Sequence, residues 1–131
     1  MKKTIAQQLK IKEFPFSIKD SNGNEIYYED SNGCWEKQEF DAKGNRIYYE
    51  YSNGDWGKFE FDANGKLIRS EFSDGYWEKR EYDANGYTIY YENSEGKITD
   101  NRPKVTLTLD EVAAKFGISV DKLHIIKTNT F

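Results

Sequence analysis

Carboxylates recur through the middle of the chain at a spacing of 21 residues. One series is Glu29, Glu50, Glu71 and Glu92, and a second is Glu39, Glu60 and Glu81. Two carboxylates can act as a general acid and base when they flank one reacting bond. A catalytic pair is a single asymmetric feature, whereas these residues recur in every unit. The pattern therefore favours a solvated face of a repeat over an active site.

Aspartates form another periodic series, at Asp20, Asp41, Asp62 and Asp83, each followed three residues later by a glycine. Segments of the type Asp-x-Asn-Gly resemble the start of a calcium loop, but the longer run of oxygen ligands that such a loop needs is missing. Aspartate also stabilises turns by accepting bonds from backbone N–H groups just after it. We expect these aspartates to cap their own turns, and we predict no metal site.

Histidine and cysteine each occur once, at His124 and Cys34. Catalytic triads need histidine, and zinc sites need several histidine or cysteine ligands. We therefore interpret both residues as structural and predict that the protein is not an enzyme and uses no cofactor. A single cysteine cannot form an internal disulfide, which fits a reducing compartment.

Aromatic and basic residues share the same period. Trp35, Trp56 and Trp77 are 21 residues apart, as are Lys37, Lys58 and Lys79. The tryptophans can serve as a stacking platform for sugars or bases, or they can pack the repeat against itself. The lysines can make cation–π contacts with neighbouring tyrosines, or they can bind anions.

The repeat itself predicts the fold. Glycines divide residues 20–101 at alternating intervals of 10 and 11 residues, and the segments between them are rich in aromatic and β-branched residues, as strands are. We predict a mainly β protein: an antiparallel meander of about eight strands in 21-residue hairpin repeats. The sheet is extended and twisted, and it can be a single layer over much of its length.

Two kinds of turn are expected within each unit. Asn32-Gly33 and Asn53-Gly54 are typical of two-residue type I′ turns, whereas Asp41-Ala42-Lys43-Gly44 and its equivalents suit a three-residue loop. One turn of each kind keeps equivalent residues on one face. This register places the three tryptophans on the same face as Tyr28, Tyr49, Tyr51 and Tyr91.

The flanks predict helical caps and divide a single domain, 1–131, into three parts. Residues 1–19 hold a short helix from Thr4 to Leu9 and a lead-in to an edge strand after Pro15. Residues 20–101 are the four-unit repeat. In residues 102–131, Thr108 can cap a helix from Leu109 to Phe116 that ends at Gly117, and His124-Ile125-Ile126 can form a closing strand.

The C-terminal stretch from Ala113 to Leu123 also resembles the core of a helix-turn-helix motif. Its second helix would carry Asp121 and little positive charge, and no third helix is evident. DNA binding through this segment is therefore a weaker alternative than a capping role.

The repeat unit resembles the YD (RHS-type) repeats. The resemblance rests on Phe40-Asp41-Ala42-Lys43-Gly44, Phe61-Asp62-Ala63-Asn64-Gly65 and Tyr82-Asp83-Ala84-Asn85-Gly86, each with a second glycine 10 residues after the first. It covers about two thirds of the chain. Members of that family are large secreted or surface proteins whose repeats form β-shells, so the resemblance implies a β-hairpin array that binds carbohydrate. This chain has only about four units, and no export signal or toxin domain is recognisable in it.

Composition and charge limit the classes of function that the sequence allows. The chain of 131 residues is 32% charged and 37% hydrophobic, yet 16% of it is aromatic, which is typical of an ordered protein with a thin core. Residues 20–101 carry 19 acidic and 9 basic side chains, a net charge of −10, between basic flanks. Such a sheet does not favour nucleic-acid binding. No segment is typical of a signal peptide or a membrane span, so we expect a soluble, cytoplasmic protein.

These observations predict a non-enzymatic protein-binding module that presents an acidic, aromatic sheet to a partner with a basic surface. A bacterial or phage accessory or inhibitor protein is the context that this composition suits. A carbohydrate- or cell-wall-binding repeat is the alternative. The candidate binding residues are Trp35, Trp56, Trp77, Tyr28, Tyr49, Tyr51, Tyr91, Glu50, Glu60 and Glu71.

Overall fold

The structure is a computed structural model that describes residues 2–104 and 107–122. Its backbone contacts form two compact units, Met1–Asn101 and Arg102–Phe131. The organisation of residues 1–131 as a single domain stays a prediction. The expected strand at His124-Ile125-Ile126 lies outside the described residues.

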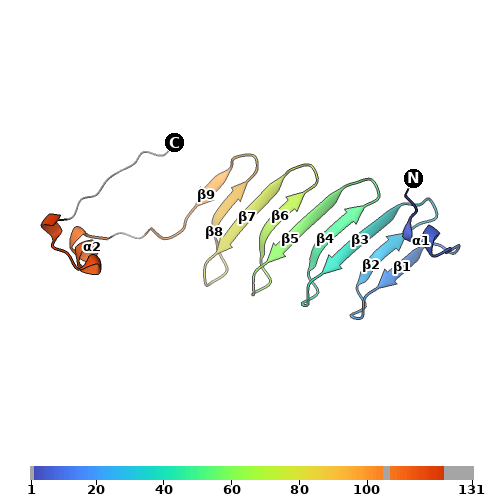
Figure 1. Ribbon diagram of the computed structural model, residues 1–131, viewed down its shortest axis with the longest axis horizontal. Coiled ribbons are helices and arrows are strands. Elements are labelled where there is room, and N and C mark those ends of the chain that lie inside the picture. The colour runs from blue at the N-terminus through green and yellow to red at the C-terminus, as the bar shows by residue number, and fades with distance from the viewer. Residues whose placement is uncertain (1, 105–106, 123–131) are drawn as a thin grey trace. The chain divides into compact units, whose positions relative to one another are not determined.

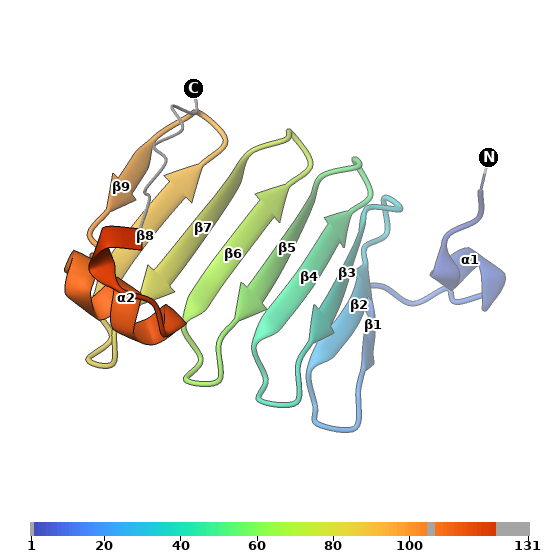
Figure 2. The same ribbon diagram turned by 60° about the vertical axis from the view of Figure 1, so that its left-hand side comes forward.

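One open sheet makes up most of the first unit, and its strands lie side by side in chain order (Figures 1 and 2). All neighbours are antiparallel, so the predicted meander is confirmed, with nine strands. They are β1 (Phe16–Lys19), β2 (Glu25–Glu29), β3 (Trp35–Phe40), β4 (Arg46–Tyr51), β5 (Trp56–Phe61), β6 (Leu67–Phe72), β7 (Trp77–Tyr82), β8 (Thr88–Asn93) and β9 (Ile98–Asp100).

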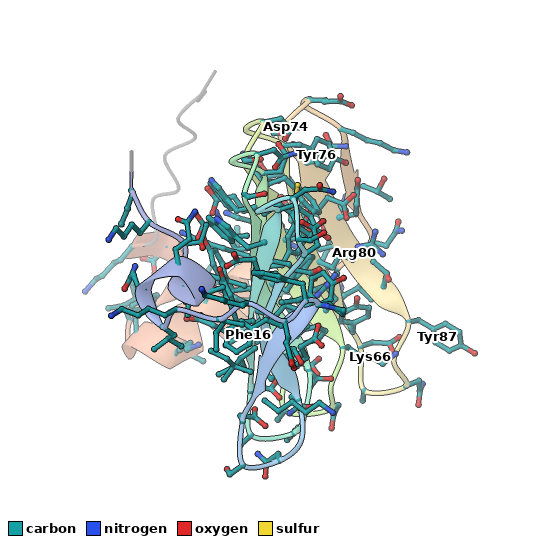
Figure 3. All side chains as sticks on the ribbon, turned by 90° about the vertical axis from the view of Figure 1, so that its right-hand side faces the viewer. Phe16, Lys66, Asp74, Tyr76, Arg80 and Tyr87 are labelled. Atoms are coloured by element: carbon teal, nitrogen blue, oxygen red, sulfur yellow. The ribbon has the colours of Figure 1, made fainter. Side chains whose placement is uncertain are left out.

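The sheet is a single layer with a very thin core. Among the described residues of the first unit, Ala6 and Tyr27 are the only buried hydrophobic residues. Side chains project from both faces of the sheet when it is seen from its β1 end (Figure 3). Stability therefore comes from contacts between neighbouring strands, as in other linear repeats.

All eight loops between consecutive strands have one form. In the loop after β2, the N–H of Asp30 donates to the carbonyl of Cys34 at 3.0 Å, and the N–H of Gly33 donates to the carbonyl of Asp30 at 3.1 Å. The loop after Asp41 has the same two bonds, so the predicted three-residue loops are confirmed there. The two-residue turns predicted at Asn32-Gly33 and Asn53-Gly54 are wrong.

Backbone angles give the physical reason for this difference. A type I′ turn needs positive φ at the asparagine as well as at the glycine. Within the described residues Lys10 is the only non-glycine residue with positive φ, whereas the loop glycines have φ between 80° and 96°. In the loop between β2 and β3, the Asp30 carboxylate accepts from the N–H groups of Asn32 and Cys34, and these two bonds favour the three-residue loop.

A β-bulge beside each of the loops that begin at Asp20, Asp41, Asp62 and Asp83 supplies the change of register that the loops do not. Phe40 pairs with Arg46, but Glu39 pairs with Tyr48, so Ile47 is an extra residue. The same irregularity leaves out Ile26, Ile68 and Ile89. Such a bulge is a regular device for adding one residue to one strand.

The bulges decide which residues share a face. Lys37 pairs with Glu50 and Glu50 with Trp56, and the equivalent pairs link Lys58, Glu71 and Trp77. Because paired residues share a face, the three tryptophans lie on one face, as predicted. The tyrosines predicted to accompany them lie on the opposite face, because the change of register falls at the bulge and not at a short turn. These are Tyr28, Tyr49, Tyr51 and Tyr91.

We predict that a side chain at a loop glycine destabilises the sheet. Gly65 has φ of +80°, and nothing lies within 4 Å of the position that its Cβ would take, so the cost of Gly65→Val is backbone strain of about 1–2 kcal/mol. The matched control is Ala63→Val in the same loop, where φ is negative. Thermal unfolding should give a lower Tm for Gly65→Val than for Ala63→Val. Equal Tm values would show that the αL position is not what fixes the loop.

The predicted helices are present. The first is α1 (Ile5–Gln8), with Thr4 as its N-cap and Leu9 as its C-cap. The edge strand β1 follows Pro15, as expected. In the second unit α2 (Leu109–Phe116) begins after Thr108 and ends at Gly117, whose φ is +68°. Residues 120–122 form a short 3₁₀ turn.

Candidate functional site

The face that carries the tryptophans repeats the same group of side chains in each unit. We call it the tryptophan face, and its residues include Tyr27, Glu29, Trp35, Lys37, Tyr48, Glu50, Trp56, Lys58, Glu60, Arg69, Glu71, Trp77, Lys79, Tyr90 and Glu92. The lysine ammonium groups lie over the tryptophan rings of their own strands, at 4.9 Å for Lys37 on Trp35 and for Lys58 on Trp56. Cation–π packing is thus confirmed, but its ring is tryptophan and not tyrosine.

The opposite face, which we call the tyrosine face, carries a continuous row of rings. Tyr51, Tyr49, Phe59, Phe72 and Tyr76 follow one another with ring centroids 5.1–6.3 Å apart. Tyr49 lies over Gly57, where a Cβ would be 2.5 Å from its ring. This row crosses β4, β5 and β6 and ends at Tyr76 in the loop before β7, so it holds these strands together through side-chain pairs.

The row ends in a polar cluster. Tyr76 donates to Glu78 at 2.9 Å, and Arg80 donates to the same carboxylate at 3.1 Å. Burial opposes ionisation of Glu78, but these hydrogen bonds outweigh it and hold its pKa below the usual value. Tyr91 also lies in this cluster, where Asn93 donates to its hydroxyl at 3.1 Å. Tyr91 itself donates to Glu78 at 3.4 Å.

The first unit of the tryptophan face binds α1. The Glu29 side chain is 2% exposed and accepts three hydrogen bonds. The Thr4 hydroxyl donates to Glu29 Oε2 at 2.8 Å, the Ala6 N–H donates to Oε1 at 3.3 Å, and the Tyr27 hydroxyl donates to Oε1 at 2.6 Å. A carboxylate at the start of a helical turn is favourable because the free N–H groups there carry partial positive charge.

Tyr27 supports this contact in two ways. Its ring stacks on Trp35 at 6.3 Å between centroids, and its hydroxyl is a donor to Glu29. Burial and the hydrogen bond to Glu29 raise the pKa of Tyr27 to about 12. The phenol therefore stays protonated, and stays a donor, over the whole physiological pH range.

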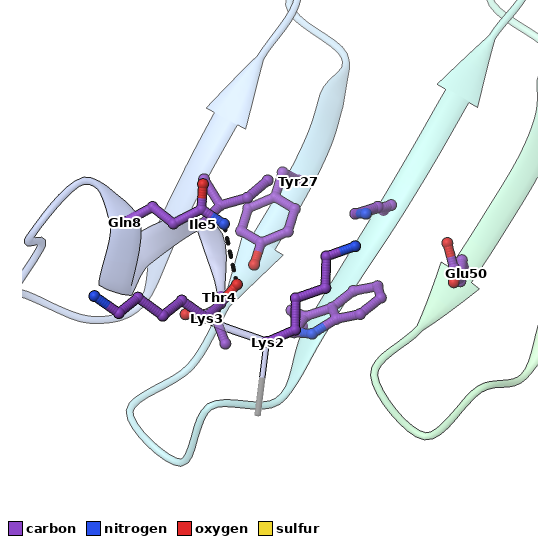
Figure 4. Close-up of a pocket in the computed structure, with 9 residues that line it drawn as sticks. Lys2, Lys3, Thr4, Ile5, Gln8, Tyr27 and Glu50 are labelled. Atoms are coloured by element: carbon purple, nitrogen blue, oxygen red, sulfur yellow. Dashed lines mark hydrogen bonds between the residues drawn. The ribbon is translucent and has the colours of Figure 1, made fainter.

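Two hollows lie beside α1 on the tryptophan face. The first, of about 300 Å³, is lined by Thr4, Ile5, Tyr27, Trp35 and Glu50 together with Lys2, Lys3, Gln8 and Lys37; Figure 4 shows Glu50 across from the α1 segment. We call it the lysine hollow. The second, of about 580 Å³, is largely apolar and is lined by residues that include Ile5, Ile18, Ile26, Ile47 and Tyr48. We call it the isoleucine hollow.

The Tyr27–Glu29 arrangement recurs along the sheet. The Tyr48 hydroxyl donates to Glu50 at 3.4 Å, and the Tyr90 hydroxyl donates to Glu92 at 2.9 Å. In the third unit Arg69 takes the place of the tyrosine and lies 4.0 Å from Glu71. Sequence reasoning treated these glutamates as a solvated series and missed the acceptor role of Glu29. The repeated Tyr-x-Glu spacing was the available signal.

The ten residues predicted to bind a partner thus fall into two groups. Trp35, Trp56, Trp77, Glu50, Glu60 and Glu71 lie together on the tryptophan face, and Tyr28, Tyr49, Tyr51 and Tyr91 lie on the tyrosine face. The aspartates cap their own loops, as predicted. The backbone N–H of Asn45 donates to Asp41, and this bond, opposed by a smaller effect of burial, holds the pKa of Asp41 below its usual value.

No group of three or more potential metal ligands occurs in residues 2–104 and 107–122. Cys34 is exposed, and His124 lies outside the described residues. Neither α1 nor α2, the helices of the part that the structure describes, has the length and apolar character needed to cross a bilayer.

No protein-family model matches the chain, and no curated protein matches it significantly. The resemblance to the YD repeats therefore stays a prediction from the repeat motif.

Proposed function

We propose that this protein is a non-enzymatic binding module whose tryptophan face docks onto a protein with a basic surface. The observation that carries the proposal is the single-layer sheet, which repeats one group of half-buried tryptophans, exposed lysines and accessible glutamates over β3 to β8. In most β domains one face of the sheet is buried against a second layer, and most of this sheet has no such layer among the described residues. Aromatic side chains at the centre of a face are the usual anchors of a protein interface.

The negative charge of the sheet supports a protein partner with a basic surface. Residues 20–101 have a net charge of −10, and Glu50, Glu60 and Glu71 lie on the tryptophan face. Single exposed ion pairs contribute only about 0–1 kcal/mol. The summed field of many charges nevertheless accelerates the encounter with a cationic surface, and salt screens that field.

Carbohydrate binding is the second candidate, and the tryptophan row is the observation in its favour. Aromatic rings can stack on sugars when their faces are free. Here, however, the Lys79 ammonium lies 5.3 Å from the Trp77 ring, as Lys37 and Lys58 lie over their rings. Stacking of a sugar would displace the lysines, so a protein partner is the better fit.

The test uses the full-length protein as bait, followed by kinetics on the partner it captures. We expect the triple variant Glu50→Gln, Glu60→Gln, Glu71→Gln to associate about three- to tenfold more slowly and with a weaker salt dependence, while folding normally. The control removes the same charge elsewhere: Glu13→Gln, Glu36→Gln, Glu95→Gln. Equal effects of the two variants would exclude the tryptophan face as the docking surface. Retention on glycans alone would support the carbohydrate candidate instead.

A further inference from the structure

We propose that the two hollows beside α1 bind the first turn of a helix from the partner protein, with Glu50 accepting its N-terminal hydrogen bonds. This inference rests on the proposed function and names the part of the partner that makes contact. The partner helix would begin with Ser or Thr, followed by an aliphatic residue and then Ala, as α1 does.

The first unit of the sheet shows this mode of binding within the protein itself. The Thr4 hydroxyl and the Ala6 N–H both donate to Glu29, and Ala6 is 0% exposed. Ile5, between them, lines both hollows. A helical turn that starts Thr-Ile-Ala therefore fits a Tyr-x-Glu unit through two hydrogen bonds and a small buried side chain.

The second 21-residue repeat of the sheet, which contains β4, offers the same groups. Glu50 is half-buried and lines the lysine hollow, and Tyr48 donates to it as Tyr27 donates to Glu29. Tyr48 and Ile47 line the isoleucine hollow, which gives an aliphatic side chain an apolar place to lie. No ion pair to Glu50 is formed within 4.0 Å by the residues that the structure describes.

The spacing of the repeat suits a helix at this position. Equivalent residues of consecutive units are two strands apart, and strands are about 4.8 Å apart, so Glu50 lies about 10 Å from Glu29 along the sheet. Packed helices have axes about 8–10 Å apart. A turn bound at Glu50 would therefore pack directly against α1.

Lys2 and Lys3 indicate which residue the partner helix would carry at its third position. Both line the lysine hollow together with Glu50. In α1 the third helical residue is Gln7, whose side chain accepts from the N–H of Thr4 in a capping box. A glutamate at that position of the partner helix would make the same bond and would also face these lysines, so we infer a segment of the form Ser/Thr–aliphatic–Ala–Glu.

The third unit supplies a natural control. Glu71 occupies the position of Glu29 and Glu50, but Arg69 replaces the tyrosine and lies within 4.0 Å of the carboxylate. The neutral hydroxyl donor is thus replaced by a cationic guanidinium group. Neutralising Glu71 should therefore leave the binding of a helical segment unchanged.

The test is a titration of the full-length, isotope-labelled protein, followed by NMR. The probe is a synthetic acetylated peptide that begins with the residues of Lys3–Leu9, carries Glu in place of Gln7, and continues with two turns of alanine-rich helix. We expect saturable shifts centred on the amides of Tyr48 and Glu50. Glu50→Gln should raise the Kd about tenfold, Tyr48→Phe should also weaken binding, and Glu71→Gln should not.

Three outcomes would overturn the inference: no saturable shift, shifts centred on Tyr27 and Glu29 through displacement of α1, or equal Kd values for Glu50→Gln and Glu71→Gln. A peptide with Val in place of its Thr tests the cap hydrogen bond directly, and it should bind more weakly than the parent. If these results are negative while a protein partner is still captured in a salt-dependent way, the proposed function stands and only the helix site is wrong.

Discussion

Replacement of Glu29 by alanine is expected to release α1 and to cost about 2–3 kcal/mol of unfolding free energy. The change leaves the Thr4 hydroxyl, the Ala6 N–H and the Tyr27 hydroxyl without their common acceptor. A buried donor without a partner costs about 1–3 kcal/mol, and release of α1 to water limits the total. Chemical denaturation should give the stability loss, and hydrogen exchange at the Ala6 amide should show the release.

Glu71→Ala is the matched control for this prediction. Glu71 has the same place in its unit, but its carboxylate lies only near Arg69, at 4.0 Å, and both side chains are more than a third exposed. The expected stability change is within about 0.5 kcal/mol, as for most surface substitutions. Continued protection of the Ala6 amide in Glu29→Ala would show that Glu29 is not what holds α1 on the sheet.

Gly57→Val should cost about 1–3 kcal/mol although valine is a better strand former than glycine. Gly57 pairs with Tyr49, and a Cβ at this position would lie 2.5 Å from the tyrosine ring and 2.8 Å from its Cζ. The ring would have to leave its place between Tyr51 and Phe59, where centroid distances are 5.1 and 6.0 Å. The free energy of unfolding in urea measures the effect.

A double-mutant cycle isolates the cause of this loss. In a Tyr49→Ala background the space above residue 57 is empty, so Gly57→Val should become neutral or stabilising. If Gly57→Val costs as much without the ring as with it, the tyrosine row is not responsible. Glu36 and Glu78 occupy the position of Gly57 in the neighbouring units, and Glu36 pairs with Tyr28, the equivalent of Tyr49. The close packing of a tyrosine ring on a glycine is therefore particular to the unit of Gly57.

Local sequence signals predicted the elements well. The glycine series located the strands, and Thr108 and Gly117 located both ends of α2, because a cap is a property of a few adjacent residues. The forms of the loops that begin at Asp30 and Tyr51 were harder to predict, since Asn-Gly suits both a two-residue turn and the end of a three-residue loop. The bulge at Ile47 was not predicted, because an isoleucine near the start of a strand is equally typical of a regular, paired position.

The candidate site was predicted only in part, because some of its features depend on strand register and on contacts between distant residues. The tryptophans were placed on one face correctly, because one change of parity per unit gives that result whether a turn or a bulge supplies it. The tyrosines were placed on the wrong face because that assignment needed the parity of each hairpin. The acceptor role of Glu29 depends on Thr4, which is 25 residues away in the sequence. No periodic pattern contains such a contact, because it occurs once, at the end of the array.

The bulged isoleucines make the two sides of the sheet chemically different. Ile26, Ile47, Ile68 and Ile89 are each left out of the pairing ladder, so removing them would leave the remaining residues with their present partners. Ile26 and Ile47 line one hollow with Tyr27 and Tyr48, and Ile68 lines another with Arg69 and Lys79. The inserted isoleucines of three units therefore add aliphatic surface next to Tyr27, Tyr48 and Arg69 of the tryptophan face, which an approaching molecule would meet there.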